Sequence, residues 1–492
     1  MSILNDHRTM QPALWNVDFL SRTYEVPPPR SDERAEIDRF IYQGYRKAGS
    51  TFLAAIEGRF AVAHHDPGQK VIFFARDWIG EQPFHWMATH KGVLVANTMS
   101  DVMQAAGDLY DYRYVRAFPQ ARFLEIDVSQ VDEACVSETL RYRDDARYFD
   151  LEEAARDPRN VFHDLDATAR RASDLLRESV ERRLGVLGGQ EQHVLLSGGL
   201  DSLSVALTLR TLGVPCVAHT LAIGEGGDDV TQAQAFARAL DIPHRVTRAS
   251  AADVRGAVKQ AIPIAETYHL YNLYCAVGMH LLGKDLSSQG VTHAWCGEAV
   301  NEALGDYHDW TIRDPITGEE RILQRVNFER MKHPAERLLY VWGQSRDRGK
   351  YNRQLGTGLA KHAGSRMVKP FAYWNIALEC PYYDRDLLAT LISVPAEPMD
   401  EIGGKPGLFL RMFRPMLNSL NFPEELVTGC RKVRLQDASE GGRGGITPIL
   451  ITGPGAIDQE RLLSLFNHQF HADLNARLET RRLAGGAPEF EL

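Results

Sequence analysis

A short apolar strand followed by a glycine-rich turn and a helix is the feature that most constrains this 492-residue chain. The apolar run is His193–Leu196, the turn reads Ser-Gly-Gly-Leu-Asp-Ser over residues 197–202, and the helical pattern that follows ends at Gly213. Glycine at this position favours a left-handed helix end. A strand that enters a helix through such a turn is typical of a parallel α/β sheet.

The residues of this turn are suited to binding phosphate. Gly198 and Gly199 let backbone N–H groups close around phosphate oxygens, and the helix N-terminus adds a partial positive charge. Ser197 and Ser202 add hydroxyl donors. Asp201 can hold a Mg²⁺ ion that shields the phosphate oxygens. We therefore expect a pyrophosphate group to bind here, and a turn that serves packing alone is the alternative.

Size and composition limit the remaining possibilities. A chain of this length exceeds one hydrophobic core, so we expect two domains. It has 44% hydrophobic and 25% charged residues, as globular proteins do, and no apolar run long enough to span a bilayer. The start of the chain lacks a secretory pattern, and six scattered cysteines form no Cys-x-x-Cys pair, which predicts a cytoplasmic protein without a zinc site or disulfide framework. The net charge of -9 argues against nucleic-acid partners and favours small-molecule or peptide substrates.

The sequence pattern changes near residue 150. Residues 52–97 alternate apolar stretches with turn residues, which predicts a domain rich in antiparallel sheet. Residues 141–165 are highly charged and predict a linker, after which amphipathic helices alternate with short apolar strands. We predict a β-rich sandwich domain over residues 1–150 and a parallel α/β domain over residues 151–492.

Further motifs follow the glycine turn in a fixed order. They are Glu266-Thr267-Tyr268, Gly297-Glu298-Ala299-Val300-Asn301-Glu302, Pro381-Tyr382-Tyr383-Asp384 and Lys405 with Leu410-Arg411. Together with the turn they resemble the motifs of the asparagine synthetase family of N-type ATP pyrophosphatases, over most of the chain. The resemblance implies an α/β ATP-pyrophosphatase domain that uses ATP and Mg²⁺, activates a carboxylate as an acyl-adenylate and forms an amide.

The resemblance also implies roles for individual residues. Glu298 would accept a proton from the attacking nitrogen, and Lys432 would stabilise negative charge on the α-phosphate and the tetrahedral intermediate. β-Lactam synthetases carry a tyrosine at the position of Glu298, so the glutamate favours the ordinary amide-forming branch. The implied ATP and pyrophosphate set is Ser197, Gly198, Gly199, Asp201, Ser202, Gly297 and Lys405, and the implied metal set is Asp201, Asn301 and Glu302.

Asn301 departs from the family pattern, which has a metal-binding aspartate at this position. An amide oxygen can ligate Mg²⁺ but does not neutralise its charge. Three interpretations stay open. Either Glu302 or the substrate phosphates make up the missing charge, or the metal binds more weakly, or the chain is a catalytically altered member of the family.

The first domain resembles the glutaminase domain of the same family, which implies an Ntn-type sandwich. The likeness rests on Ser31-Asp32-Glu33, Gly58 to Asp66, and Arg76-Asp77 with Gly80 and Pro83. In that family the nucleophile is a cysteine that becomes the first residue, whereas Ser2 follows Met1 here. The segment before residue 31 is also too short for the family's glutamine-binding loops. We expect a degenerate, inactive glutaminase-like scaffold, and a nucleophilic Ser2 is the alternative.

These observations predict a ligase of specialised metabolism that adenylates a small-molecule or peptide carboxylate. It would couple this carboxylate to ammonia or an amine that does not come from its own hydrolysis of glutamine. An intramolecular cyclase, of the β-lactam or lasso-peptide kind, and a nucleotide-binding protein without turnover are the alternatives. The sequence leaves open the two substrates, the pocket residues within 308–380, and the oligomeric state, for which a homodimer is one option.

Overall fold

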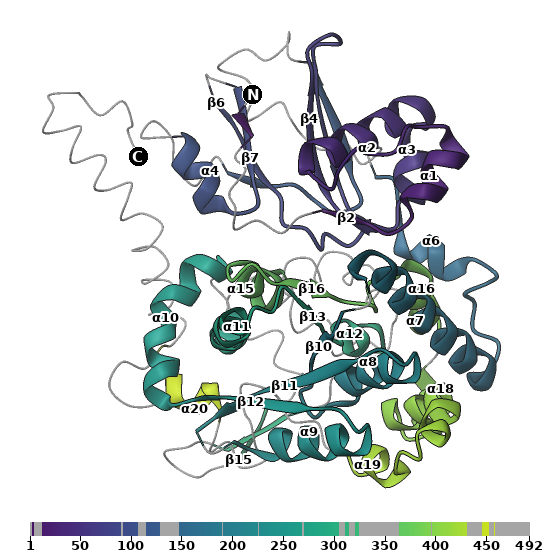
Figure 1. Ribbon diagram of the computed structural model, residues 1–492, viewed down its shortest axis with the longest axis vertical. Coiled ribbons are helices and arrows are strands. Elements are labelled where there is room, and N and C mark those ends of the chain that lie inside the picture. The colour runs from purple at the N-terminus through teal and green to yellow at the C-terminus, as the bar shows by residue number, and fades with distance from the viewer. Residues whose placement is uncertain are drawn as a thin grey trace, which may run out of the picture.

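A computed structural model describes the parts of the chain that position the candidate site. The described residues are 2–3, 12–89, 92–106, 115–127, 147–188, 190–224, 226–267, 270–304, 310–313, 320–323, 364–394, 396–430, 445–451 and 457. Figure 1 shows an upper part that contains α1 to α4 and a lower part that contains α7 to α20. The domain boundary between residues 150 and 151 stays a prediction, because residues 128–146 lie outside these ranges.

The upper part contains two small sheets and one separate pair of antiparallel strands. Its strands are β1 (Ser2–Ile3), β2 (Ala13–Leu14), β3 (Gly58–Arg59), β4 (Ala61–Asp66), β5 (Val71–Arg76), β6 (His85–Thr89), β7 (Gly92–Ala96), β8 (Arg116–Ala117) and β9 (Phe123–Asp127), and its helices are α1 (Val17–Tyr24), α2 (Arg34–Ala48), α3 (Ser50–Ala55) and α4 (Met99–Ala106). One sheet has the order β4-β5-β9 and is antiparallel. The other has the order β1-β7-β6-β8, in which β1 alone runs parallel to its neighbour.

Side-chain alternation along the strands builds the layers of this part. On β5, Ile72 and Phe74 pack between the two sheets, whereas Phe73 and Ala75 pack against the helices α1 to α3. The strands β6 and β7 alternate in the same way between the inter-sheet core and α4. Phe73 and Phe74 are fully buried, and each contributes about 1.5–3 kcal/mol of apolar burial. The predicted β-rich sandwich is confirmed, with helices on both outer faces (Figure 1).

One buried carboxyl group between α2 and β4 makes the stability of the first domain depend on pH. Asp38 of α2 accepts a hydrogen bond from Ala63 N at 3.4 Å and lies 3.8 Å from Arg34 Nε, while its Oδ1 atom is buried without a hydrogen-bond partner. Burial raises the pKa of Asp38 to about 7, and Arg34 offsets only part of this effect. Folding therefore takes up a proton, so this group destabilises the domain progressively as the pH rises from about 4 to about 7.

Asp38→Asn is expected to raise the free energy of unfolding by about 1–3 kcal/mol at pH 8, because it removes a buried charge. At pH 3 the gain should nearly vanish, since Asp38 is then mostly protonated in both states. Urea denaturation of the two proteins at both pH values measures this difference. Asp18→Asn on the exposed face of α1 is the matched control. A gain of equal size at both pH values would contradict the account.

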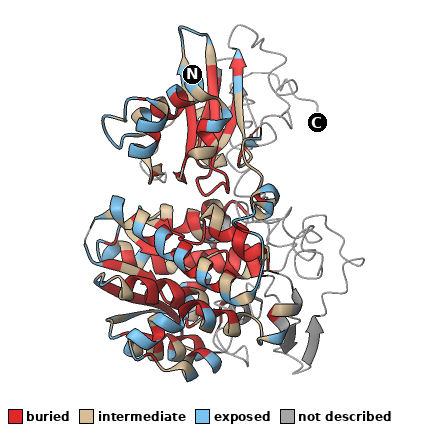
Figure 2. Ribbon diagram, turned by 90° about the vertical axis from the view of Figure 1, so that its right-hand side faces the viewer, coloured by how far each residue is buried: buried red, intermediate tan, exposed pale blue. Residues whose placement is uncertain are grey.

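The lower part is built around a five-stranded sheet. Its strands are β10 (Gln192–Leu195), β11 (Cys216–Ile223), β12 (His244–Ala249), β13 (His293–Trp295) and β16 (Ala377–Glu379), and β14 (Trp310–Arg313) and β15 (Glu320–Leu323) form a separate hairpin. The order in the sheet is β12-β11-β10-β13-β16, and every neighbouring pair is parallel. The predicted parallel α/β domain is confirmed. All eight residues of β11 are buried, as expected for a strand covered on both faces (Figure 2).

Helices cover this sheet and carry the candidate site at its edge. They are α6 (Leu151–Arg156), α7 (Leu165–Leu187), α8 (Leu200–Thr211), α9 (Asp228–Ala239), α10 (Ala251–Ala265), α11 (Leu270–Ser288), α12 (Val300–Leu304), the π-helix η5 (Gly364–Val368), α15 (Lys369–Ala372), α16 (Arg385–Ile392), α17 (Ala396–Glu401), α18 (Lys405–Ser419), α19 (Glu424–Thr428) and α20 (Ile446–Ile451). Among the described helices, none is both long and apolar enough to cross a membrane.

The strand order contains one reversal. From β10 the chain continues outward to β11 and β12, and it then returns to place β13 on the other side of β10. In open parallel sheets, ligands bind at the carboxyl ends of the strands beside such a reversal. The topology therefore points to the carboxyl ends of β10 and β13, where the residue 197–202 turn and the residue 297–302 motif begin.

A buried cluster of charged side chains joins the two parts. Arg59 of β3 donates a hydrogen bond to Glu379 Oε1 at 2.7 Å and another to the Leu378 carbonyl at 3.1 Å. Arg183 of α7 lies on the other side of the same carboxylate, with 3.5 Å between its Nε and Glu379 Oε2. Each of these charged side chains is at most 5% exposed. The first domain is therefore anchored to the second through a buried carboxylate of the second domain that pairs with an arginine from each domain.

Candidate active site

The turn after β10 requires glycine at residue 198. Gly198 has φ +75°, and a Cβ atom there would lie 2.5 Å from the carbonyl oxygen of Asp229, the second residue of α9. Gly199 is the N-cap of α8 and supplies no side chain to the helix start. The backbone of the turn thus passes close to α9, and the first N–H groups of α8 lie at the carboxyl edge of the sheet.

The two serines of the turn lie in different environments. Ser202 is buried; its hydroxyl donates to the Gly199 carbonyl at 3.0 Å and accepts from Ser197 N at 3.1 Å, so it fixes the shape of the turn. Ser197 is exposed, and its Oγ lies 3.2 Å from that of Ser202. Ser197 is therefore the serine of this turn with a hydroxyl on the surface.

Gly198→Ala should abolish nucleotide binding and destabilise the protein, because the new methyl group meets a backbone carbonyl that cannot move independently. Gly213→Ala is the matched control, since Gly213 has a similar φ of +72° with no atom within 4 Å of an added Cβ. The left-handed backbone alone costs about 1–2 kcal/mol in both variants. Thermal unfolding and ATP titration should show a larger loss for Gly198→Ala, and equal behaviour of the two variants would contradict the geometry.

The second motif contacts the first through a glycine. An added Cβ at Gly297 would lie 2.4 Å from the backbone carbon and oxygen of Asp201 and 2.8 Å from Ser202 N. Only a residue without a side chain allows the loop after β13 to lie directly on the first turn of α8. The structure thus brings together two motifs that are about a hundred residues apart in the sequence.

Asp201 meets residues from two further helices. Lys405 Nζ donates to Asp201 Oδ1 at 3.0 Å and Oδ2 at 3.3 Å, and to Asn301 Oδ1 at 2.6 Å. The three side chains come from the start of α8, from α12 and from the start of α18. Lys405 is 11% and Asp201 17% exposed, so water screens this ion pair only in part. Three residues that the sequence predicted for nucleotide or metal binding therefore form one hydrogen-bonded group.

The described donors of this group do not fit a magnesium site built by protein side chains alone. One carboxylate and one amide surround an ammonium group, where Mg²⁺ would need several oxygen ligands. Within the described ranges, no cluster of three or more His, Cys, Asp or Glu side chains is placed to hold a metal ion. Glu302 lies in α12, but its side chain is outside the described part of the structure.

Glu298, the predicted proton acceptor, pairs with an arginine that the sequence motifs do not mark. Its carboxylate accepts a hydrogen bond from Arg366 Nη2 of η5, and both side chains are 14% exposed. Ala299, which follows it, has φ +86°, a conformation that glycine adopts more readily. Arg366 lies in the stretch 308–380 that we expected to contain pocket residues, and no local pattern distinguishes it there from a surface arginine.

Other predicted motifs serve the framework around the site. Glu266 is buried and accepts hydrogen bonds from Lys369 Nζ at 2.5 Å and from Ser100 N of the first domain at 3.1 Å. Burial by itself would raise the pKa of Glu266, but the Lys369 ammonium outweighs it and lowers this pKa. Asp384 caps α16 by accepting from Leu387 N at 2.9 Å. These two motif residues hold elements in place.

Lys432 lies outside the described residues, so its predicted role stays a prediction. The last described residue before it, Cys430, donates its thiol to the Gly198 carbonyl at 3.4 Å. Burial raises the pKa of Cys430 to about 11, so the group is a neutral thiol at neutral pH. The chain that leads to Lys432 therefore contacts the glycine turn two residues before the lysine.

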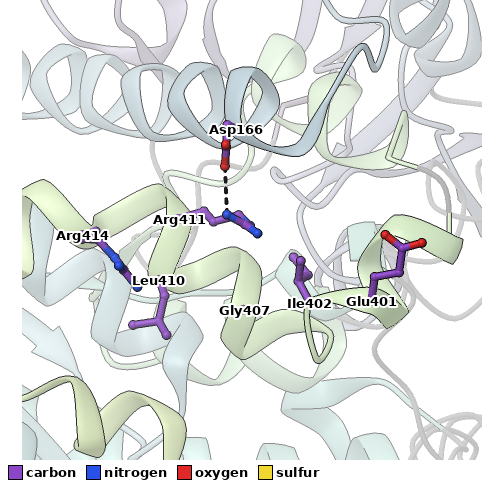
Figure 3. A pocket seen from close by; sticks show the side chains of 7 residues that line it. All are labelled: Asp166, Glu401, Ile402, Gly407, Leu410, Arg411 and Arg414. Atoms are coloured by element: carbon purple, nitrogen blue, oxygen red, sulfur yellow. Dashed lines mark hydrogen bonds and ion pairs between the residues drawn. The ribbon is translucent and has the colours of Figure 1, made fainter.

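A separate cavity of about 450 Å³ lies along α18 (Figure 3). Its lining residues are Asp166, Glu401, Ile402, Gly407, Leu410, Arg411 and Arg414. Figure 3 shows Arg411 reaching toward Asp166 of α7, with which it pairs at 2.9 Å. None of the predicted site residues lines this cavity, so we do not assign it to the group around Asp201.

Comparisons with known proteins agree with this architecture. Residues 15–154 match the profile described as glutamine amidotransferase domain, and residues 171–357 match the profile described as asparagine synthase. The chain is similar to the glutamine-hydrolysing asparagine synthetase of Gallus gallus, at 24% identity over 250 residues, and to that of Rattus norvegicus, at 23% over 257 residues; each alignment covers 49% of this chain and 44% of the relative. A probable asparagine synthetase of Schizosaccharomyces pombe is 25% identical over 283 residues, which cover 54% of this chain and 46% of the relative.

The chain thus aligns with less than half the length of these curated relatives. Both profiles nevertheless match in the order of the two domains seen in the structure, and the asparagine synthase profile includes the glycine turn and the Glu298 motif. The two profile matches and the similarity to these relatives together support an asparagine synthetase-like family for this chain.

Proposed function

We propose that this protein is an ATP-dependent carbon–nitrogen ligase that forms AMP and pyrophosphate, acting in the cytoplasm in specialised metabolism. The observation that carries the proposal is the convergence of Gly297 and Lys405 on Asp201 at the start of α8. This convergence places a glycine turn, a helix N-terminus and a lysine at the reversal of the sheet, which is the arrangement expected of a polyphosphate site.

The proposed reaction has two steps. A substrate carboxylate oxygen attacks the α-phosphorus of ATP, and the bond between the α-phosphorus and the bridging oxygen breaks to release pyrophosphate. The N–H groups at the start of α8, the Ser197 hydroxyl and the Lys405 ammonium balance the charge of this leaving group. A Mg²⁺ ion bound to the phosphates of ATP would shield their oxygens, and the residues of this group would contact the phosphates beside it.

In the second step an amine attacks the acyl carbon of the adenylate. The nitrogen loses a proton to Glu298, and AMP leaves with one oxygen of the original carboxylate. Arg366 holds the Glu298 carboxylate in one orientation through their ion pair. Lys432 is proposed to stabilise the negative charge that develops in both steps.

The nitrogen is proposed to come from ammonia or an amine substrate. Residues 1–150 contain one cysteine, Cys135, and the described contacts of this domain are those of a scaffold, through Arg59 and Ser100. A glutaminase-like domain retained for such contacts needs no nucleophile of its own. The carboxylate substrate is a small molecule or a peptide.

Product analysis tests this proposal. The protein is incubated with MgATP and a panel of amino-acid and peptide carboxylates, with ammonia, an amine or glutamine as the nitrogen source. We expect AMP, pyrophosphate and an amide with ammonia or an amine, and no amide with glutamine alone. A product formed without any added amine would identify a cyclase. ATP binding without AMP formation across the whole panel would identify a protein without turnover and contradict the proposal.

A further inference from the structure

The cation that faces Asp201 belongs to the protein. Lys405 Nζ lies within hydrogen-bond distance of three oxygens, two on Asp201 and one on Asn301. An ammonium group has three N–H donors and no acceptor, so these three oxygens can satisfy it completely. They are also the oxygens that a divalent ion between residues 201 and 301 would use.

Asn301 adds no charge to the described part of this arrangement. Among the described side chains, one carboxylate charge faces one ammonium charge, and the amide of Asn301 adds an oxygen without adding charge. A divalent ion placed here would compete with the lysine for the same single carboxylate at low exposure to water, where repulsion between cations is strong. An aspartate at residue 301 would change the balance by one negative charge.

The backbone fixes Lys405 where it can occupy this position. Lys405 is the first residue of α18, after Gly404 with φ +72°, and Pro406 follows it. The next turn of the helix is closely packed, since an added Cβ at Gly407 would lie 1.8 Å from the Ile402 carbonyl oxygen. Leu408 is buried and anchors the same turn in the core. The close packing of this turn therefore fixes the backbone position of Lys405.

We propose that Lys405 is the resident cation of the pyrophosphate site and takes the place of a protein-bound divalent ion between Asp201 and residue 301. Divalent metal then reaches the site only as a complex with nucleotide phosphates. Because Asn301 stands where the family has an aspartate, the Lys405 ammonium is sufficient to neutralise the Asp201 carboxylate. The inference rests on the proposed function only for the choice of ATP as the ligand.

Manganese binding to the nucleotide-free protein is the first test. Isothermal titration with MnCl₂ should show no site tighter than about 1 mM in the wild type. Asn301→Asp should bind Mn²⁺ at least about tenfold more tightly, because two carboxylates then face each other. The double variant D201N/N301D should lose that site. A stoichiometric wild-type Mn²⁺ site that Asp201→Asn removes would overturn the proposal.

ATP binding in EDTA is the second test. The wild type should bind ATP without metal, Lys405→Arg should retain this binding, and Lys405→Met should weaken it at least about tenfold. Arg414→Met removes an exposed ion pair on the same helix and is the matched control, with circular dichroism to verify folding. Equal ATP affinity of Lys405→Met and the wild type in EDTA, or no wild-type binding there, would overturn the proposal.

These outcomes are separate from those of the proposed function. If the binding pattern holds but no AMP forms with any carboxylate, the ligase proposal fails and the role of Lys405 stands. If AMP and amide form but the wild type binds Mn²⁺ through Asp201, the role of Lys405 fails and the ligase proposal stands.

Discussion

Glu379→Ala is expected to lower the free energy of unfolding by about 3–5 kcal/mol, because it leaves two buried guanidinium groups without their shared counterion. Glu379 is 1% exposed and lies between Arg59 of the first domain and Arg183 of the second. Burial by itself lowers the pKa of Arg59, but Glu379 and Glu81 outweigh it and raise this pKa. Removing Glu379 therefore leaves Arg59 charged in a low-dielectric interface.

Thermal and urea unfolding of Glu379→Ala measure this effect. Arg177→Ala, which breaks an exposed pair with Glu181, is the control and should change stability by at most about 0.5 kcal/mol. Because the cluster joins the domains, we also expect the variant to unfold in two transitions. A small, single-transition change like that of the control would show that the interface does not depend on this carboxylate.

Glu298→Gln is expected to slow amide formation by about 10²–10⁴-fold and to leave adenylation nearly intact. Glutamine keeps the shape of the side chain but cannot accept the proton that the attacking nitrogen loses. The carboxylate acts only in the second step, so carboxylate-dependent exchange of labelled pyrophosphate into ATP should persist while the amide product falls.

Exchange and product formation measured on the same preparation separate these two steps. Glu298→Asp is the useful companion, since it keeps a base at a changed distance and should recover part of the amide formation. An equal loss of exchange and of product in Glu298→Gln would contradict the assigned role and would place Glu298 in nucleotide binding or in folding.

Local signals in the sequence predicted the glycine turn correctly as a strand-to-helix connection. Strand, turn and helix are consecutive in the sequence, which makes the connection recognisable. The need for glycine at residue 198 comes from its φ of +75° and from the distant Asp229 carbonyl, and only the structure shows that contact. The alternation of apolar residues over 52–97 likewise predicted the sandwich, because side chains on a strand face opposite layers. The helices on its outer faces were not predicted.

Long-range pairs of charged groups were beyond reach of the sequence pattern. Lys405 and Asp201 are 204 residues apart, and Arg59 and Glu379 are 320 apart. Arg59 and Glu379 resemble ordinary surface residues until the fold buries them beside each other. The motif order suggested that Asp201, Asn301 and Lys405 share a site, but only the packing of α8, α12 and α18 shows the lysine between the two oxygen-bearing side chains. Arg366 lies in none of the sequence motifs.

The transfer of oxygen from the substrate to AMP tests the central claim, acyl-adenylation, most directly. A carboxylate substrate labelled with ¹⁸O in both carboxyl oxygens is incubated with MgATP, the amine and the protein, and AMP is analysed by mass spectrometry. The account predicts AMP that carries one ¹⁸O atom and unlabelled pyrophosphate. AMP without label, or ADP and labelled inorganic phosphate in place of AMP, would contradict it.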